Sequence, residues 1–301
     1  MKKILKYLLM ITAAVMLWSC SDDKLGDAKV FKDPDPASYT NFDKWLLSNY
    51  TYPYNIAFKY KMQDIESDFS YNLSPATTAN AIAMSKLIKH LWLEVYDEVS
   101  GIEFTRMHIP KVIHLIGSGA YNSNNTVLLG TAHSGMKITL YEINSLNPAN
   151  ITASTITERY LKTMYHEFAH ILHQKINYPI EFKAITTRDY ISDDWSTAAA
   201  TLPIANQRGF VSRYARKEYN EDFVEILSIY VTRGQANWDS ILAASNSVAS
   251  GNTKTGKVLI EEKLQIVREY MQDVWGIDID ELRRVLEEHL VTMHDLDLIN
   301  L

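Results

Sequence analysis

The chain contains a single cysteine, Cys20, so it can form no disulfide bond within one molecule. It also lacks a basic excess, because 30 lysines and arginines stand against 36 aspartates and glutamates, for a net charge of −6. This balance keeps a protein soluble and argues against nucleic acid or anionic lipid as a partner. From Tyr39 onward there is no repeat, no low-complexity stretch and no evident linker. The sequence therefore predicts one domain over residues 39–301, which is long enough to bury a full core.

The first twenty residues are typical of an exported protein. A segment with three lysines precedes an apolar run over residues 8–18, which is too short to span a bilayer. This pattern predicts a signal peptide over residues 1–19. The next residue, Cys20, stands where a lipobox places the cysteine that is acylated after cleavage, so we expect a lipid anchor there. Because Trp18 is bulkier than the usual residue at its position, the alternative is an ordinary secretory signal with Cys20 left free.

Residues 20–38 carry several aspartates and prolines and little that could enter a core, so we expect an extended tether. Within it, Ser21-Asp22-Asp23 resembles the acidic export signal that sends lipoproteins of Bacteroidota to the outer leaflet. The resemblance implies an outer-membrane lipoprotein exposed at the cell surface, with the periplasmic face as the alternative. Without residues 1–19 the chain keeps 27 basic and 36 acidic residues, and its net charge becomes −9.

Residues 166–170 read His-Glu-Phe-Ala-His and lie within a run, Ile156 to Ile176, whose apolar residues recur every three or four positions. On a helix, residues four apart share a face, so His166 and His170 can present two imidazoles to one metal ion. Glu167 would stand beside them, where a carboxylate can take a proton from a metal-bound water. The motif alone also fits an ordinary helix that happens to carry two histidines. A third ligand is needed to decide between these interpretations.

His173 extends the motif along the same side of the helix, seven residues after His166. Seven residues rise about 10.5 Å along a helix, whereas two nitrogens on one zinc ion lie no more than about 4 Å apart. No glycine between His170 and Tyr178 could turn the chain back. We therefore expect His173 to orient the ligands from behind, or to lie at the surface, rather than to bind the metal.

A better third ligand lies downstream, where Asn220 is the expected N-cap of another helix. Glu221 and Glu225 would lie one turn apart on one face of this helix. Two carboxylates that point the same way repel each other unless a cation or a hydrogen-bond donor lies between them. Taken alone, the pair also fits a solvated acidic face. Together with the preceding histidine motif, it favours Glu221 as a metal ligand.

At this point the sequence resembles a known family. Ser212-Arg-Tyr214 is followed, seven residues after the tyrosine, by Glu221-Asp-Phe-Val-Glu225. This arrangement resembles the gluzincins that include the catalytic domain of anthrax lethal factor. The resemblance implies that Glu221 is the third zinc ligand, that Glu225 supports the site, and that Tyr214 donates a hydrogen bond to the oxyanion.

A second resemblance rests on the wider series of motifs HEFAHILHQ, SxYA and EDFxE. Together with the lipoprotein-like start and the chain length, it is similar to zinc metallohydrolase lipoproteins of Bacteroidota that accompany outer-membrane nutrient import systems. That resemblance implies a nutrient import complex in the outer membrane as a partner.

The order of elements predicts an α+β, zincin-like fold with a small mixed sheet, an active-site helix and a mainly helical C-terminal portion. A long helix should begin at Ser74-Pro75 and continue through about Val99. Later segments have the patterns of strands at Lys111 to Ile116, Thr126 to Gly130 and Lys137 to Glu142, and of helices at Lys254 to Trp275 and Asp280 to His294. We expect the Lys137 to Glu142 strand to form the edge along which an extended substrate pairs.

The sequence therefore predicts a zinc-dependent peptidase acting on a peptide or protein substrate. Zinc would be held by His166, His170 and Glu221, with water in the fourth position, and Glu167 would be the general base. Three alternatives stay open. The protein could be an accessory lipoprotein that binds glycan or peptide with little turnover, or an enzyme acting on an amide other than a peptide bond. A structural or adhesive surface protein would be favoured if Glu221 proved remote from the two histidines.

Overall fold

The computed structural model describes residues 36–62, 70–121, 127–128, 130–133 and 136–301. The predicted signal peptide, the anchor residue Cys20 and most of the predicted tether lie outside these residues. Within the described part of the chain, no helix combines the length and the apolar character needed to cross a membrane.

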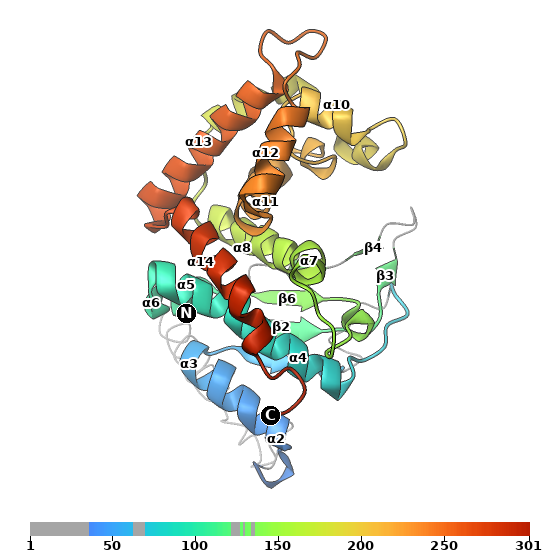
Figure 1. The fold of residues 1–301 in the computed structure, drawn as a ribbon, viewed down its shortest axis with the longest axis vertical. Coiled ribbons are helices and arrows are strands. Elements are labelled where there is room, and N and C mark those ends of the chain that lie inside the picture. Colours follow the sequence, from blue (N-terminus) through green and yellow to red (C-terminus); the bar gives the residue numbers. More distant parts are fainter. Residues whose placement is uncertain (1–35, 63–69, 122–126, 129, 134–135) are drawn as a thin grey trace, which may run out of the picture. The chain divides into compact units, whose positions relative to one another are not determined.

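The chain divides into a first unit that ends at Thr40 and a second unit over Asn41–Leu301. In the first unit, the 3-10 turn η1 (Pro36–Ser38) is described. The second unit is a mixed α+β fold that is mostly helical and contains a small sheet (Figure 1). This confirms the predicted mixed class.

The sheet has four strands in the order β1-β2-β6-β5. Their bounds are β1 (Ala57–Lys59), β2 (Val112–Leu115), β5 (Gly130–His133) and β6 (Lys137–Leu140). β1 and β6 run parallel to β2, whereas β5 runs antiparallel to β6, so the sheet is mixed as predicted. A separate antiparallel pair joins β3 (Ala120–Tyr121) to β4 (Val127–Leu128).

The prediction that the Lys137 to Glu142 strand forms an edge of the sheet is wrong. β6 contains the segment that we expected at the edge, but it lies inside the sheet, paired with β2 on one side and β5 on the other. The strand order ends in β5 on this side and in β1 on the other. Gly130, expected to close a strand, instead begins β5. A Cβ atom at Gly130 would lie 2.5 Å from Thr163 Cγ2, so β5 packs closely against the helix that carries the histidine motif.

The N-terminal part of the second unit contains α2 (Asn41–Leu46), a π-helical turn η2 (Leu47–Thr51) and α3 (Tyr52–Tyr54) before β1. A long helix follows as α4 (Thr78–Ile88), the π-helical turn η4 (Lys89–Leu93) and α5 (Glu94–Ser100), and α6 (Ile102–His108) leads into β2. The expected start of the long helix at Ser74-Pro75 is wrong by a few residues. Pro75 forms an isolated bridge with Ile116, and the Thr77 hydroxyl caps the helix by accepting from the Asn80 N–H.

The predicted helix around the histidine motif is present. α7 (Ala153–Ile156), the π-helical turn η6 (Thr157–Leu161) and α8 (Lys162–Lys175) form one continuous helical segment. After it come shorter elements, α9 (Glu181–Ile185), η8 (Ser192–Ser196), α10 (Leu202–Gln207) and the turn η9 (Tyr214–Arg216). The C-terminal helices are α11 (Tyr219–Thr232), α12 (Gly234–Ala244), α13 (Gly256–Trp275) and α14 (Ile279–Thr292), which confirms a mainly helical C-terminal portion.

The expected N-cap of α11 is wrong. The helix begins at Tyr219, and Glu218 holds the extended cap position. The side chain of Asn220 is engaged elsewhere, since its Oδ1 accepts a hydrogen bond of 2.9 Å from the Tyr178 hydroxyl. Glu221 still falls in the first turn, as expected.

The core places α8 and α11 side by side. α8 packs against β5 on one side and against α11 on the other, and Figure 1 shows it between the sheet and the C-terminal helices. Every residue of α11 from Glu221 to Thr232 is buried. Under α8, Phe168 meets Trp92 edge-on with ring centroids 5.8 Å apart. Burying such side chains stabilises the fold by roughly 1.5–3 kcal/mol each and fixes the two helices that carry the site.

Candidate metal centre

His166, His170 and Glu221 converge, as the sequence predicts. The histidines come from successive turns of α8, and Glu221 comes from the first turn of α11. Its Oε2 lies 3.2 Å from Nε2 of His166 and 3.2 Å from Nε2 of His170. One ligand atom from each residue lies within 4.8 Å of the other two. We call these three residues the metal centre.

The donor set of the metal centre fits zinc. Two imidazole nitrogens and one carboxylate oxygen form a three-ligand set typical of catalytic zinc, in which ligands lie about 2.0–2.2 Å from the ion and a fourth position stays open. Burial raises the pKa of the Glu221 carboxyl, but its contacts with His166 and His170 outweigh burial and hold that pKa well below its usual range. Glu221 is therefore ionised, which a metal ligand must be.

Glu225 supports His166 from behind. It is fully buried, and its Oε1 lies 2.8 Å from Nδ1 of His166. The same carboxylate is paired with the Lys162 ammonium and accepts a hydrogen bond of 2.6 Å from the Ser212 hydroxyl. A carboxylate this close to Nδ1 favours the proton on that nitrogen, which would leave Nε2 of His166 available to a metal.

His173 plays the corresponding part for His170. Its Nε2 lies 2.9 Å from Nδ1 of His170, and the side chain is buried. Burial and the neighbouring His170 lower the pKa of His173 to about 4, so it is a neutral acceptor at pH 7. His170 can then donate from Nδ1 and keep Nε2 for the metal. The structure thus places His173 behind a ligand and outside the metal centre, as expected.

Tyr214 lies in the turn η9 before α11, and its hydroxyl is hydrogen-bonded to Glu221. It donates a hydrogen bond of 2.7 Å to Glu221 Oε1, the carboxylate oxygen that does not face the histidines. The Lys217 ammonium lies 3.1 Å from the same oxygen and 3.4 Å from the hydroxyl. The tyrosine ring packs edge-on against Trp195 with centroids 4.8 Å apart. Burial and the charge of Glu221 raise the pKa of Tyr214 well above its usual range, so the hydroxyl stays a donor.

Glu167 occupies the position next to His166 on α8 and is only partly buried. Its negative charge contributes to the raised pKa of Tyr214. Glu167 is therefore close enough to Tyr214 for its charge to be felt at the hydroxyl.

A buried ion pair anchors α11 behind the site. The Lys263 ammonium on α13 lies 2.6 Å from Asp222 Oδ2, and both side chains are fully buried. Lys263 also donates to the Gly209 carbonyl at 2.9 Å, and the Tyr190 hydroxyl donates to Asp222 at 2.9 Å. Burial raises the pKa of Asp222 to about 6, although Lys263 acts in the opposite direction. Asp222 follows Glu221 directly, so this pair fixes the end of α11 that carries the ligand.

Two lysines of the site, Lys162 and Lys217, and the role of the Ser212 hydroxyl were not predicted from the sequence. Lys162 precedes His166 by one helical turn, and Lys217 precedes Glu221 by the same interval. Residues four apart share a helix face, so this spacing indicates that Lys162 lies on the same side of α8 as His166. The same argument is weaker for Lys217, because Lys217 lies before the first residue of α11 and helical spacing need not apply to it.

Comparison with known proteins assigns the family. A family model described as "putative zinc-binding metallo-peptidase" matches residues 35–280. The chain belongs to this family. It is also similar to the crystal structure of "a putative zinc-binding metallo-peptidase" from Bacteroides caccae ATCC 43185, with 40% identity and a TM-score of 0.73, covering 89% of this chain and 98% of that chain. No curated protein matches the chain. Zinc is therefore the metal of this metallopeptidase family member, and the metal centre provides ligands that suit it.

Proposed function

We propose that this metallopeptidase family member hydrolyses peptide bonds with a zinc-activated water. The observation that carries the proposal is the approach of Glu221 to Nε2 of both histidines, with Glu167 next to His166 on the same helix. A scaffold that merely holds zinc needs the three ligands but no base. The presence of Glu167 therefore supports turnover rather than binding alone.

The roles of the residues follow from their contacts. Zinc, when bound, supplies a Lewis acid that lowers the pKa of a bound water toward 7. Glu167 takes a proton from the attacking water and can return it to the leaving amine. Glu225 and His173 hold the protons on the outer nitrogens of His166 and His170, so that both Nε2 atoms stay directed at the metal.

We assign Tyr214 to the oxyanion that forms as the carbonyl is attacked. Its hydroxyl now donates to Glu221 Oε1, so this role requires it to move from Glu221 to the substrate. Lys217 lies near both groups and can remain paired with Glu221 when the hydroxyl leaves. A donor to the oxyanion contributes roughly 2.7–4 kcal/mol in comparable sites.

We propose that an extended substrate binds along β5. This strand ends the described sheet on the side of β6 and packs directly against α8. Strand addition uses backbone groups at the edge of a sheet and needs no particular side chain. Substrate bound there would lie next to the helix that carries His166 and Glu167.

We further propose that the protein is an outer-membrane lipoprotein, anchored through Cys20, exposed at the surface and associated with a nutrient import complex. The segment around residues 2–23 supports this, as does the similarity to a Bacteroides protein. Labelling of cells with a radioactive fatty acid should mark the wild type and not Cys20→Ser. Protease added to intact cells should digest the protein. Absence of label would favour an ordinary secretory signal, and resistance to protease would favour the periplasmic face.

The proposed activity is tested by removal of the metal. Incubation with a chelator should abolish cleavage of a broad peptide library, and one equivalent of zinc should restore it. If the zinc-loaded protein cleaves no peptide but binds peptide or glycan, the accessory-protein alternative is favoured.

A further inference from the structure

Trp195, in η8, lies against the tyrosine of the site. Its ring meets the Tyr214 ring with centroids 4.8 Å apart and planes 83° apart, and both side chains are partly buried. Aromatic rings prefer this edge-to-face geometry, so each ring restricts the position of the other. The Tyr214 ring also lies 5.9 Å from the ring of His166, centroid to centroid. We propose that Trp195 is a positioning residue, which holds the Tyr214 side chain so that its hydroxyl stays at the metal centre.

The backbone that follows Tyr214 is tied to the segment of residues 191–197, which contains Trp195. We call this segment the brace. The backbone N–H groups of its first two residues donate to the carbonyl oxygens of Arg216 and Lys217 at 2.8 Å and 3.1 Å. These hydrogen bonds fix the chain two and three residues after the tyrosine.

Arg213 makes the corresponding connection before the tyrosine. Its Nη2 atom donates to the carbonyl oxygens of Trp195 and Thr197 at 3.1 Å and 2.7 Å. Because Arg213 directly precedes Tyr214, the brace is bonded to the chain on both sides of the tyrosine. Trp195 therefore packs against a residue whose backbone is fixed, and the contact between the two rings limits the direction of the Tyr214 side chain.

The oxyanion role proposed for Tyr214 makes this limit matter for turnover, and the catalytic effect of Trp195 rests on that role. In the structure the hydroxyl donates to Glu221 Oε1 at 2.7 Å, so it has to move to reach an oxyanion. With the backbone fixed, the movement is a rotation of the side chain. A ring packed against Trp195 has a restricted path, whereas an unsupported ring would occupy other rotamers. A misplacement of about 1 Å can lower turnover by about 100-fold.

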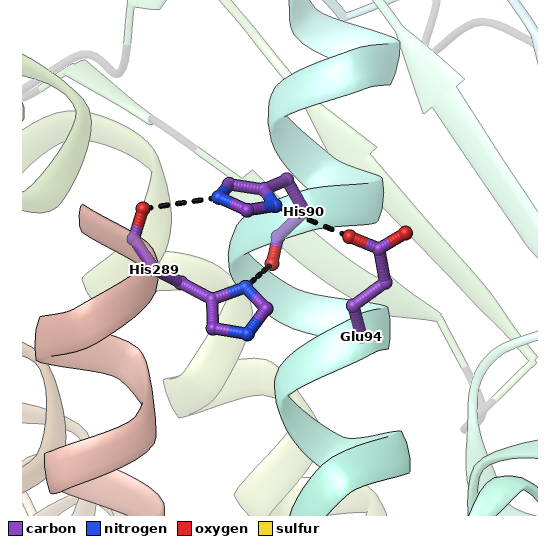
Figure 2. Close-up of side chains that lie close together, drawn as sticks. All are labelled: His90, Glu94 and His289. Carbon is purple, nitrogen blue, oxygen red and sulfur yellow. Dashed lines mark hydrogen bonds and ion pairs between the residues drawn. The ribbon is translucent and has the colours of Figure 1, made fainter. Parts of the chain in front are cut away.

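Zinc content in the experiments below reports on the metal centre. His90, Glu94 and His289 form another group of close histidine and glutamate side chains, between the long N-terminal helix and α14 (Figure 2). Nδ1 of His289 lies 2.7 Å from the His90 carbonyl oxygen, and Nε2 of His90 lies 3.1 Å from the His289 carbonyl oxygen. The other nitrogens face two different carboxylates, Glu94 at 3.2 Å and Glu98 at 3.0 Å. Hydrogen bonds and ion pairs account for this group, so we expect about one zinc ion per chain.

The first measurement is a double-mutant cycle on the zinc-saturated full chain, with a peptide that the wild type cleaves. Trp195→Ala should lower kcat by about tenfold or more and leave KM and zinc content nearly unchanged. In the Tyr214→Phe background the same change should cause little further loss, because the hydroxyl that Trp195 positions is already gone. Trp195→Phe keeps an aromatic ring and should restore most of kcat. Trp45→Ala is the matched control, since Trp45 is a partly buried tryptophan on α2 whose ring lies 6.2 Å from that of Tyr50, and its kcat should equal that of the wild type.

Three results of the cycle overturn the proposal. The first is a kcat of Trp195→Ala equal to that of the wild type. The second is a loss by the same factor in the presence and absence of the Tyr214 hydroxyl, because Trp195 would then act independently of Tyr214. The third is a raised KM at unchanged kcat, which would make Trp195 a contact of the substrate.

A second measurement needs no turnover, so its failure and the failure of the peptidase proposal can be told apart. A fluorinated tyrosine is introduced at position 214 alone, and its fluorine NMR signal is followed as zinc is added to metal-free protein. Zinc draws on the charge of Glu221, to which the hydroxyl donates, so the signal should shift in the otherwise wild-type chain. Trp195→Ala should lose most of this shift, and Trp195→Phe and Trp45→Ala should keep it.

An equal shift in Trp195→Ala and the wild type overturns the positioning role, even if the enzyme cleaves peptides. A signal that does not respond to zinc in the wild type also overturns it, because the hydroxyl would not be held at Glu221. Loss of the shift in Trp195→Ala, in a protein that cleaves no peptide, would support the positioning role and contradict the peptidase.

Discussion

Glu225 Oε1 lies 2.8 Å from Nδ1 of His166, while Nε2 of the same ring faces Glu221 at 3.2 Å. The imidazole is thus held between two carboxylates, one positioned to orient it and one that would share its metal. Lys162 and Ser212 contact the orienting carboxylate in turn. The direction of the ligand atom is therefore determined by residues that never approach the metal, and this relationship can be tested separately from the chemistry.

Changing Glu225 should weaken zinc binding without removing a ligand. We expect Glu225→Ala to raise the Kd for zinc by about 10–100-fold, as is usual when the partner of a metal-binding histidine is lost. Glu225→Gln should recover part of the affinity, because its amide oxygen can still accept from Nδ1. Competition with a chelating dye measures both. Glu158→Ala, an exposed glutamate on η6, is the control, and an effect on Kd no larger than the control's would remove Glu225 from this role.

Tyr214→Phe separates two roles for the hydroxyl. If the hydroxyl binds the oxyanion, kcat and kcat/KM should both fall by about 100-fold or more, with KM and zinc content nearly unchanged. If it serves only to hold Glu221, the contact seen in the structure, zinc affinity should fall while kcat of the zinc-saturated enzyme stays near that of the wild type. Steady-state kinetics with saturating zinc and a zinc titration distinguish the two results.

Removing one member of the buried pair behind α11 should cost far more than removing a surface charge. Lys263→Met leaves Asp222 buried without its cation, and we expect a loss of about 3–5 kcal/mol in the free energy of unfolding. Urea denaturation of the metal-free protein measures this. Lys257→Met, on the same helix but partly exposed beside Glu261, should stay within about 0.5 kcal/mol of wild type.

The double variant Asp222→Leu/Lys263→Met checks the cause of that loss. Because it leaves no unpaired charge, it should be less destabilised than the sum of the two single variants. Strict additivity would show that the two side chains contribute through packing rather than through their charges.

Pairing of the substrate with β5 predicts a pattern along the peptide. N-methylation removes one backbone donor at a time, and in an extended strand only alternate residues direct that donor to the sheet. Methylation at every second position should therefore lower kcat/KM, while the positions between them tolerate it. A series of singly N-methylated copies of one cleaved peptide provides the measurement. Equal effects at neighbouring positions would argue against strand addition.

Local patterns predicted much of this protein because they report on local structure. The spacing of His166 and His170 has meaning only on a helix, and their segment has the periodicity of one. The strand at β6 and the helices α13 and α14 were also found close to their observed positions. Glu221 was reached through its position in the first turn of a helix, together with the resemblance carried by Tyr214 and Glu225.

What the sequence could not predict depends on contacts between distant segments. The place of β6 inside the sheet follows from its pairing with both β2 and β5. The alternation of apolar and polar residues along a strand has a period of two and does not reveal which strands are its neighbours. The helix expected at Pro75 starts later because Pro75 is bridged to Ile116 and its carbonyl accepts from Asn144. Likewise, the ion pair between Lys162 and Glu225 forms only because α8 and α11 pack together.

The most direct test of a zinc-dependent peptidase is turnover by Glu167→Gln at matched zinc content. The change keeps His166, His170 and Glu221 and the shape of the side chain, and it removes only the base. We predict equal zinc per chain, the same melting temperature within error, and a kcat lower than that of the wild type by about 100- to 10,000-fold. Equal turnover by the two proteins would contradict the role of Glu167, and inactivity of both on a broad peptide library would contradict the peptidase itself.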